Sequence, residues 1–335
     1  MVDTVQIREV GPRDGFQNEP EVISTEEKIE LVDMLARTGL RRLEVTSFVR
    51  ADVIPQLSDA EEVLAGIDVP AEVSLSVLIP NERGLDRALT VREELAARAA
   101  SGGRPAFDEI NVFLSASETH NRKNVNRSIE ESLASLEKVL ARARAEGLRC
   151  EGIISTSFGC PYEGRVPPER VLQIAARLRD AGAQEIGFGD TTGMANPVQV
   201  GELFGQAFEI LGRGGDMSPG GEVRARAQGE QGVQLTAHFH NTRGQGLANV
   251  LAALQVGVTS FESSFGELGG CPVPPGATGN IASEDLVSML HEMGISTGID
   301  LDALLACSRR AQESLGRRLT SHTLVAGSVD WHEAG

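Results

Sequence analysis

Residues 149–189, RCEGIISTSFGCPYEGRVPPERVLQIAARLRDAGAQEIGFG, contain one complete strand–helix–strand unit. The short runs Arg149–Ser155 and Glu185–Gly189 have the composition of buried strands. Between them, Pro168–Ala181 carries apolar residues at helical spacing, and Gly182 follows where a helix commonly ends. A strand, a helix and a second strand in this order are typical of parallel α/β architecture.

The same alternation continues along the chain, from the first residues to about position 263. Further helical patterns include Thr25–Arg37, Ile129–Ala145, Val198–Leu211 and Gly246–Gln255. The expected strands are Val5–Glu9, Arg42–Thr46, Val73–Leu78, Glu109–Leu114, Arg149–Ser155, Glu185–Gly189, Gln234–His238 and Thr259–Ser263. Since eight strands are the number that closes a barrel, the sequence predicts an α/β fold of the (β/α)8 TIM-barrel type.

The helix ends carry recognisable signals. Ser24 precedes Glu27, Ser128 precedes Glu131, and Asn196 precedes a proline at the start of a helical pattern. Such residues cap helix N-termini. Glycines follow helical patterns where C-terminal glycines belong, at Gly39, Gly147, Gly182 and Gly257.

Beyond the barrel pattern, Leu301–Arg318 has a helical pattern, and the residues after it have little regular apolar spacing. We therefore assign residues 1–296 to a TIM-barrel catalytic domain and residues 297–335 to a C-terminal helical extension, a cap and tail. Residues 95–105 and 212–232 resemble insertions, because glycine and charged residues accumulate there without an apolar repeat. Neither segment carries an obvious catalytic group.

Composition limits the possible partners and the compartment. The chain has 335 residues and a formal charge of −17, from 48 acids against 31 lysines and arginines. This charge argues against a nucleic-acid or anionic-membrane surface. The four cysteines are widely spaced, which favours a reducing compartment. The first expected strand leaves no room for a targeting peptide, and no apolar run has the length of a membrane span, so we expect a cytoplasmic protein.

Three distant segments contain residues suited to one metal site. In an extended segment alternate side chains share a face, so His238 and His240 can direct two imidazoles at one point. Asp14 offers a hard anionic oxygen and Asn280 a neutral oxygen. Cys271 lies in the glycine-rich run Gly269–Pro272, and its thiol need not be a ligand.

These polar residues fall at or near the C-terminal ends of the expected strands. Asp14 follows the first strand, Glu44 lies in the second, and Asp190 ends the sixth. The histidines end the seventh strand, and Cys271 follows the eighth. In a TIM barrel these ends form the catalytic face, so the placement favours an enzyme.

Several motifs together resemble the hydroxymethylglutaryl-CoA lyase family, which belongs to the metal-dependent Claisen-type lyases and synthases on TIM barrels. The resemblance covers roughly positions 5 to 315, with the motifs in family order. The motifs are VGPRDGFQN (10–18), LEVTSFV (43–49), GCPYEG (159–164), GDTT (189–192), HFHNT (238–242), GGCP (269–272) and GATGNIASED (276–285).

The resemblance implies a retro-Claisen lyase that cleaves 3-hydroxy-3-methylglutaryl-CoA to acetoacetate and acetyl-CoA. It implies a divalent cation, Mg²⁺ or Mn²⁺, and an acyl-CoA substrate. A homo-oligomer is possible. The implied metal ligands are Asp14, His238, His240 and Asn280, and the implied substrate contacts are Arg13 and Gln17.

The implied catalytic groups are Arg13, Cys271, Glu44 and Asp190. Arg13 would stabilise the developing enolate oxygen, and Cys271 would protonate the enolate carbon. Glu44 and Asp190 would orient the ligands, the arginine or the proton path. Asp14, a histidine ligand and a metal-bound water all remain candidates for the base that takes the hydroxyl proton.

Alternative interpretations remain at this level. The chain departs from well-known members of the family at Phe16, Phe239 and Asn241, which stand where Leu, Cys and Asp are usual. A lyase for a related thioester such as a citramalyl-CoA, a Claisen-type synthase or aldolase on the same barrel, and a non-catalytic metal-binding barrel are the alternatives. Arg13 paired with Glu44 as a purely structural ion pair is the alternative for that residue.

Overall fold

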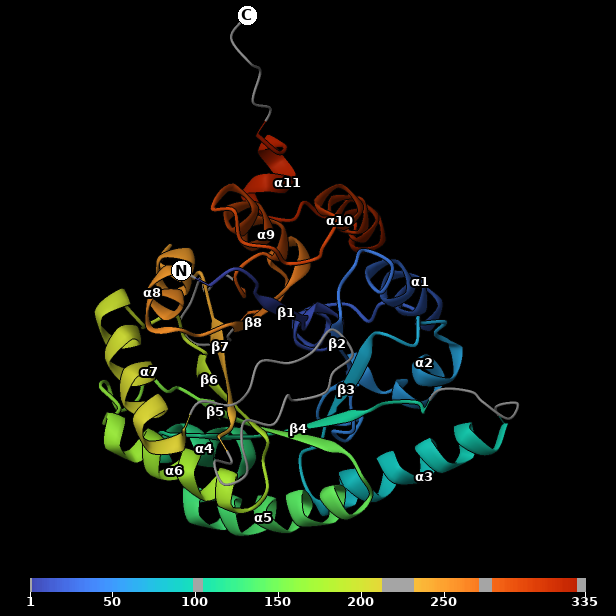
Figure 1. Cartoon of the computed structure of the whole chain (residues 1–335). Coiled ribbons are helices and arrows are strands. Elements are labelled where there is room, and N and C mark those ends of the chain that lie inside the picture. Colours follow the sequence, from blue (N-terminus) through green and yellow to red (C-terminus); the bar gives the residue numbers. More distant parts are fainter. Residues whose placement is uncertain (1, 99–104, 213–231, 271–278, 330–335) are drawn as a thin grey trace, which may run out of the picture.

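The computed structural model describes residues 2–98, 105–212, 232–270 and 279–329. Its centre is a closed barrel in which each strand pairs in parallel with the next and the eighth pairs with the first (Figure 1). The strands are β1 (Gln6–Glu9), β2 (Arg42–Ser47), β3 (Ser74–Leu78), β4 (Glu109–Ser115), β5 (Arg149–Ser155), β6 (Glu185–Asp190), β7 (Gln234–Phe239) and β8 (Ser260–Ser263). The predicted TIM barrel is confirmed, and the strand ends differ from prediction by only a residue or so.

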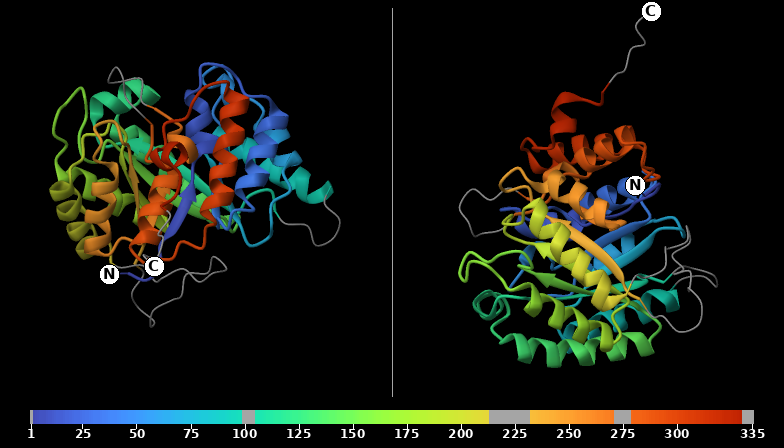
Figure 2. Two further views of the ribbon diagram at one scale, coloured as in Figure 1. Left: turned by 90° about the horizontal axis from the view of Figure 1, so that it is seen from above. Right: turned by 60° about the vertical axis from the view of Figure 1, so that its left-hand side comes forward.

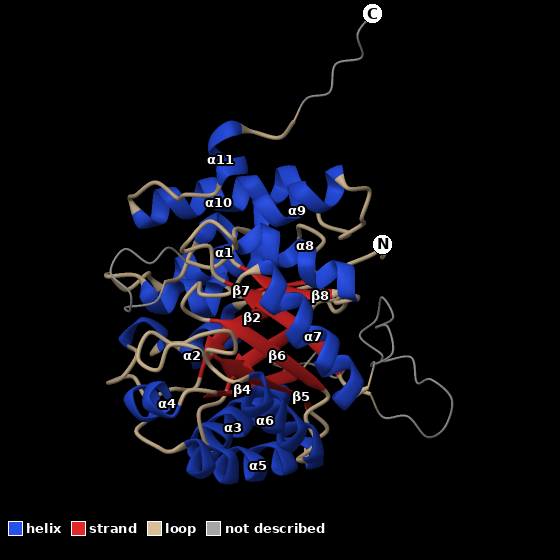
Figure 3. Cartoon of the chain, turned by 90° about the vertical axis from the view of Figure 1, so that its left-hand side faces the viewer, coloured by secondary structure: helices blue, strands red, loops and turns tan. Residues whose placement is uncertain are grey.

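Helices surround the strands on the outside (Figure 3). They are α1 (Thr25–Leu35), α2 (Ala60–Gly66), α3 (Glu82–Arg98), α4 (Glu118–Val125), α5 (Ile129–Ala145), α6 (Pro168–Asp180), α7 (Pro197–Leu211), α8 (Gly246–Val256), α9 (Ser283–Glu292), α10 (Leu301–Leu315) and α11 (His322–Ala326). The sequence patterns did not predict α2, α4, α9 or α11. No helix in the described ranges combines the length and apolar character that crossing a bilayer requires.

The capping signals behave as predicted. Ser128 and Glu131 form a reciprocal capping box at the start of α5, and Asn196 accepts two backbone N–H groups at the start of α7. All four glycines predicted to end helices have positive φ. Helix α1 ends at Leu35 rather than at the predicted Arg37, because the backbone N–H groups of Arg37 and Thr38 donate to carbonyls three residues back, those of Met34 and Leu35, in a turn that leads to Gly39.

The C-terminal helices gather beside α1, on one side of the barrel (Figures 1 and 2). Helix α10 packs against α1 and α9, and α11 packs against α9. Apolar residues of α10 such as Leu304 and Ala311 are fully buried there. Helices α10 and α11 both lie within the predicted extension, residues 297–335, whose last six residues are outside the described part.

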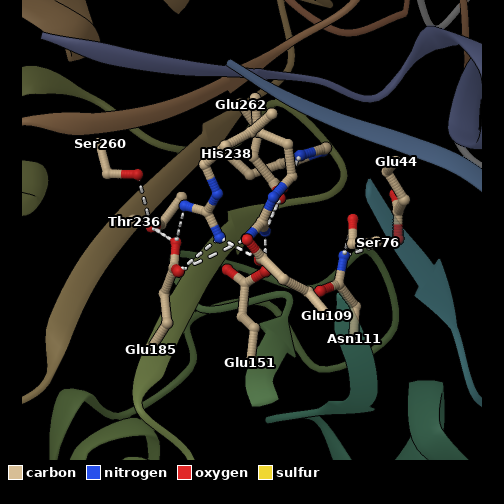
Figure 4. A network of polar contacts seen from close by, with 12 residues as sticks. Glu44, Ser76, Glu109, Asn111, Glu151, Glu185, Thr236, His238, Ser260 and Glu262 are labelled. Atoms are coloured by element: carbon tan, nitrogen blue, oxygen red, sulfur yellow. Dashed lines mark hydrogen bonds and ion pairs between the residues drawn. The ribbon is translucent and has the colours of Figure 1, made fainter. Parts of the chain in front are cut away.

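The interior of the barrel is filled by charged side chains. Arg8 of β1 and Arg42 of β2 are each 1 % exposed and contact buried glutamates of other strands. Arg42 donates to Glu109 at 2.5 Å and to Glu185 at 2.7 Å, and Arg8 donates to Glu262 at 2.9 Å. Figure 4 shows these glutamates and Glu151 directed toward one another across the barrel. Because opposite charges are paired here, the burial of each ion is offset by its partners.

Candidate active site

A tight turn after β1 presents Arg13 and Asp14 at the C-terminal end of the barrel. Residues Gly11–Gly15 form one π-helical turn, an arrangement often found at functional sites. Both glycines are sterically required, since a Cβ on Gly11 would lie 2.5 Å from the Phe265 ring and one on Gly15 would lie 2.8 Å from Leu268. The close packing fixes the backbone from which Arg13 and Asp14 project.

His238 and His240 meet at the end of β7. Their Nε2 atoms lie 3.1 Å apart, and one ligand atom from each, together with one carboxylate oxygen of Asp14, lies within 4.8 Å of the others. His238 Nδ1 is 2.9 Å from Glu262 Oε2, and donation to this carboxylate leaves the Nε2 lone pair free. Such a carboxylate–histidine arrangement is common around metal ligands.

Asn280 joins this group from the segment before α9. Its backbone forms an antiparallel bridge with His240. Its Nδ2 donates to Asp14 Oδ2 at 2.7 Å and to the Leu268 carbonyl at 3.1 Å. Its Oδ1 is buried and accepts no hydrogen bond from the described residues. A buried acceptor without a donor is costly, and a cation would satisfy it. The donor set of Asp14, His238, His240 and Asn280 therefore fits a divalent metal.

The electrostatics favour metal-binding protonation states for Asp14 and His240. Burial raises the pKa of Asp14, but the charges of Arg13, His238 and His240 and the hydrogen bond from Asn280 together outweigh it, so the net pKa is lowered. Burial and the charge of His238 lower the pKa of His240 to about 3. Burial lowers the pKa of His238, but the hydrogen bond that it donates to Glu262 and the charges of Glu262 and Asp14 together raise it, so the net pKa is raised and the protonated form is favoured. At neutral pH Asp14 is an anion and His240 a neutral ligand.

Arg13 is held by two carboxylates. Its Nε lies 2.6 Å from Glu44 Oε2, and its Nη1 donates to Asp14 Oδ1 at 2.8 Å. Glu44 in turn accepts from Asn111 Nδ2 at 2.8 Å. The ion pair that the structural alternative requires is therefore present, but Arg13 also lines the pocket beside the histidines. These contacts leave part of the guanidinium fork, which has five N–H groups, for a ligand.

Asp190 is buried and does not line the pocket itself. Its Oδ1 accepts from the backbone N–H groups of Met194 at 2.7 Å and Ala195 at 3.0 Å. Its neighbours Gly189 and Thr191 line the pocket. Burial raises the pKa of Asp190 to about 7, so this carboxyl group exchanges a proton near neutral pH.

A pocket of about 470 Å³ opens over these groups. Arg13, Asp14, Gln17 and both histidines lie at its polar end. Its other walls combine apolar and polar side chains, including Val49, Val53, Ile54, Leu78, Phe113, Ile153, His120, Lys123, Asn124 and Tyr162. Gln17 Nε2 donates to Asp14 Oδ1 at 2.7 Å, so the predicted substrate residue also orients the predicted ligand.

The cysteines fall into different groups. Cys271 lies outside the described residues, although Gly270 just before it lines the pocket. Burial raises the pKa of Cys150 and of Cys307 to about 12, so neither is a reactive thiolate. Cys160 is buried and its Sγ accepts from Tyr162 N at 3.4 Å, which shapes the loop after β5.

Two parts of the site were not found from the sequence. Glu262 holds His238, but nothing in the sequence separates it from an ordinary strand residue. Helix α4 brings His120, Lys123 and Asn124 to the pocket. His120 has no partner at a useful spacing in the sequence, so nothing there marks it as a site residue. The Ser117 cap before Glu118 was the signal that would have revealed α4.

Comparison with known proteins agrees with this geometry. The HMGL-like family profile matches residues 4–310. The chain belongs to the HMGL-like family. The resemblance predicted from the motifs is therefore confirmed, as is its assignment to a family of carbon–carbon lyases.

Relatives of this family resemble the chain over nearly its whole length. The hydroxymethylglutaryl-CoA lyase YngG of Bacillus subtilis is 44 % identical over 320 residues, which cover 96 % of each chain. The crystal structure of the Bacillus subtilis HMG-CoA lyase superposes with a TM-score of 0.84 at 42 % identity and covers 97 % of this chain and 98 % of that one. An HMG-CoA lyase from Acinetobacter baumannii, in complex with coenzyme A and 3-methylmalate, has a TM-score of 0.83 at 39 % identity and covers 99 % and 98 %.

Proposed function

We propose that this protein is a metal-dependent carbon–carbon lyase that cleaves 3-hydroxy-3-methylglutaryl-CoA to acetoacetate and acetyl-CoA. The observation that carries the proposal is the convergence of Asp14, His238 and His240 in the wall of a pocket, with Asn280 hydrogen-bonded to Asp14 and its Oδ1 without a partner among the described residues. Relatives at 44 % and 41 % identity are named as lyases for this substrate.

Mg²⁺ or Mn²⁺ is the proposed cation. The carboxylate of Asp14 and the amide oxygen of Asn280 are hard ligands suited to Mg²⁺, and two imidazoles make Mn²⁺ equally acceptable. When bound, the cation lowers the pKa of the substrate hydroxyl and orients it. His240, neutral at physiological pH, needs no deprotonation to serve as a ligand.

The reaction needs negative charge to be stabilised away from the cation. Loss of the hydroxyl proton turns that oxygen into the ketone of acetoacetate, and the electron pair of the broken C–C bond forms the enolate of acetyl-CoA. Arg13, fixed by Glu44 and Asp14, is the group placed to stabilise the enolate oxygen. A proton must then reach the enolate carbon.

Two residues are proposed to supply and remove protons. By family resemblance we assign the protonation of the enolate carbon to Cys271. Asp190 has a pKa of about 7, which suits a group that exchanges protons at neutral pH. Its position behind Gly189 and Thr191 supports a role in the proton path rather than in direct contact with the substrate.

The other end of the pocket suits the acyl-CoA. Lys123 lies 4.6 Å from the centre of the Tyr162 ring and carries the positive charge that a CoA phosphate needs. Apolar walls at Val49, Leu78 and Phe113 suit the acyl chain. The relative from Acinetobacter baumannii was solved with coenzyme A, which supports the same class of ligand here.

A coupled assay for acetyl-CoA release tests the proposal. Wild-type protein is expected to release acetyl-CoA from 3-hydroxy-3-methylglutaryl-CoA with Mg²⁺ or Mn²⁺, and to stop after chelation. Arg13→Met and Cys271→Ala are expected to lose about 100-fold or more in kcat, because each removes a transition-state interaction. Arg50→Met, at an exposed arginine, and Cys307→Ala, at a buried cysteine of α10, are the matched controls.

Two results would count against the proposal. A folded protein that binds Mn²⁺ but releases no acetyl-CoA would remove the substrate assignment, and release from a citramalyl-CoA would replace it. Equal loss of activity in Cys271→Ala and Cys307→Ala would remove the role assigned to Cys271.

A further inference from the structure

The turn after β8 holds a buried glutamate in a backbone conformation that favours glycine. Glu267 has a φ of +62° and is only 7 % exposed, and Gly266 before it has a φ of +66°. A side chain in left-handed geometry is disfavoured, and such residues persist where their surroundings hold them, often near functional sites. The contacts that hold Glu267 in this conformation therefore matter for the candidate metal site beside it.

The partner of Glu267 is the residue that follows a predicted metal ligand. Asn241 comes directly after His240, and its Nδ2 donates to Glu267 Oε1 at 2.9 Å. The backbone N–H of Asn241 donates to the Gly279 carbonyl at 3.1 Å. Its Oδ1 accepts from Gly246 N, at the start of α8, at 3.3 Å. Asn241 thus connects β7 with the turn after β8 and with the segment that carries Asn280.

The turn that contains Glu267 packs directly against the segment Gly279–Asn280. A Cβ on Gly279 would lie 2.5 Å from the Glu267 carbonyl oxygen and 2.6 Å from that of Gly269. Asn280 Nδ2 donates to the Leu268 carbonyl at 3.1 Å. Asn280 is therefore enclosed between His240–Asn241 on one side and Glu267–Gly269 on the other.

We propose that Asn241 and Glu267 form a positioning pair that holds Asn280 Oδ1 toward the point where His238, His240 and Asp14 converge, and so sets the affinity for a divalent cation. The inference rests on the proposed metal-dependent function. Neither residue touches the predicted ligand atoms, so the pair acts through the backbone on both sides of Asn280.

The polarity of the pair decides which residue type suits position 241. With Glu267 opposite, an aspartate would bring two carboxylates to the present 2.9 Å separation, which is repulsive in a buried site. An amide at position 241 provides the donor that Glu267 needs.

Four proteins test the pair: the wild type, Asn241→Asp, Glu267→Gln, and the double variant. The double variant restores one donor and one acceptor in reversed order and has the same formal charge as the wild type. The measured quantity is the Mn²⁺ dissociation constant of each metal-free protein, by titration calorimetry. Glu209→Gln, an exposed glutamate on α7, is the control for loss of a negative charge.

Asn241→Asp is expected to bind Mn²⁺ about tenfold more weakly or worse, a loss typical of residues that orient metal ligands, and the double variant is expected to recover to within about threefold of the wild type. If only the attraction between the cation and nearby negative charge mattered, Asn241→Asp would bind Mn²⁺ more tightly than the wild type, because it adds a negative charge beside the ligands. If Asn241→Asp binds Mn²⁺ as tightly as the wild type, or if the double variant is as weak as Asn241→Asp, the inference is overturned.

Two further outcomes are decided by the same titrations. Should Asn241→Asp fail to fold, the double variant decides alone: binding within about threefold of the wild type supports the pair, and a weakening beyond about tenfold overturns it. Absence of Mn²⁺ binding by the wild type would overturn the proposed function together with this inference. Wild-type binding that does not respond to the pair would overturn the inference alone.

Discussion

The interior of the barrel and its C-terminal end both bury ionisable groups, but they arrange them differently. Inside, the glutamates contact guanidinium groups, as Glu109 and Glu185 contact Arg42. At the C-terminal end, candidate ligand atoms face one another: the two histidine Nε2 atoms lie 3.1 Å apart and Asn280 Oδ1 has no donor among the described residues. In the first arrangement each glutamate has a guanidinium partner. The second lacks a positive charge at its centre, which is the difference between a structural network and a binding site.

Glu262 belongs to both regions. It accepts from Arg8 Nη1 at 2.9 Å and contacts His238 Nδ1 at 2.9 Å (Figure 4). Burial raises the pKa of Glu262. The hydrogen bond from His238 and the charge of Arg8 lower it, and the net pKa is lowered. The interior network therefore keeps Glu262 ionised and able to hold the histidine.

Removal of a proposed ligand is the largest expected change. His240→Ala should lower kcat/KM by about 1,000-fold or more, because the cation loses a direct ligand. The metal-free protein should keep its stability to within about 1 kcal/mol, since groups gathered for binding contribute little to folding. Urea unfolding beside the coupled assay measures both. A variant that keeps its activity would contradict the ligand assignment.

Removal of an interior arginine should lower the stability of the protein and leave its Mn²⁺ affinity nearly unchanged, the reverse of His240→Ala. Arg42→Met leaves buried carboxylates without one of their partners and is expected to destabilise the protein by about 3 kcal/mol or more. Mn²⁺ affinity should change little in the fraction that is folded. Arg50→Met, at an arginine whose side chain is 76 % exposed, is the control and should cost less than about 0.5 kcal/mol. If Arg42→Met costs no more than this control, the network has no structural role.

Glu262→Gln tests the connection between the two regions. Glutamine keeps the shape but weakens the acceptor that fixes His238, so Mn²⁺ affinity should fall about tenfold to 30-fold. Stability should fall less than in Arg42→Met, because Arg8 retains other carboxylate partners. Unchanged Mn²⁺ affinity in calorimetry would show that Glu262 does not orient the ligand.

Asp190→Asn gives the smallest expected effect and concerns pH. Burial raises the pKa of Asp190 from 3.8 to about 7, so the folded state holds this proton more tightly than the unfolded state. Its contribution to stability is complete below about pH 4 and is lost as pH rises through 7. Between pH 6 and 7 the variant should lose less stability than the wild type, by on the order of 1 kcal/mol. Parallel pH dependences in urea unfolding would contradict the shifted pKa.

Much of the barrel was predictable because its information is local. Each strand is a short β-rich run, and the helix caps at Ser128 and Asn196 lie within a few residues of the groups they satisfy. The strand ends then placed Asp14 and the two histidines on one face without any knowledge of their distances. The structure brings these residues together with Asn280, as the sequence predicted.

The charged interior and the outer pocket were not predictable, because their partners are distant in sequence. Arg8 and Glu262 are 254 positions apart, and nothing near either residue identifies the other. Charged residues within strands resemble solvent-facing positions until the barrel closes. Asn241 was noticed as a departure from the family, but its partner Glu267 became visible only through the backbone geometry of the turn after β8.

The most direct test of the contrast between the two regions is an anomalous-difference map from crystals of the wild-type protein soaked in MnCl2. We predict one strong peak about 2.1 Å from His238 Nε2 and His240 Nε2, next to an Asp14 oxygen and Asn280 Oδ1, and none in the interior network. A map without a peak at this position, or with a peak among Glu109, Glu151 and Glu185, would contradict the account.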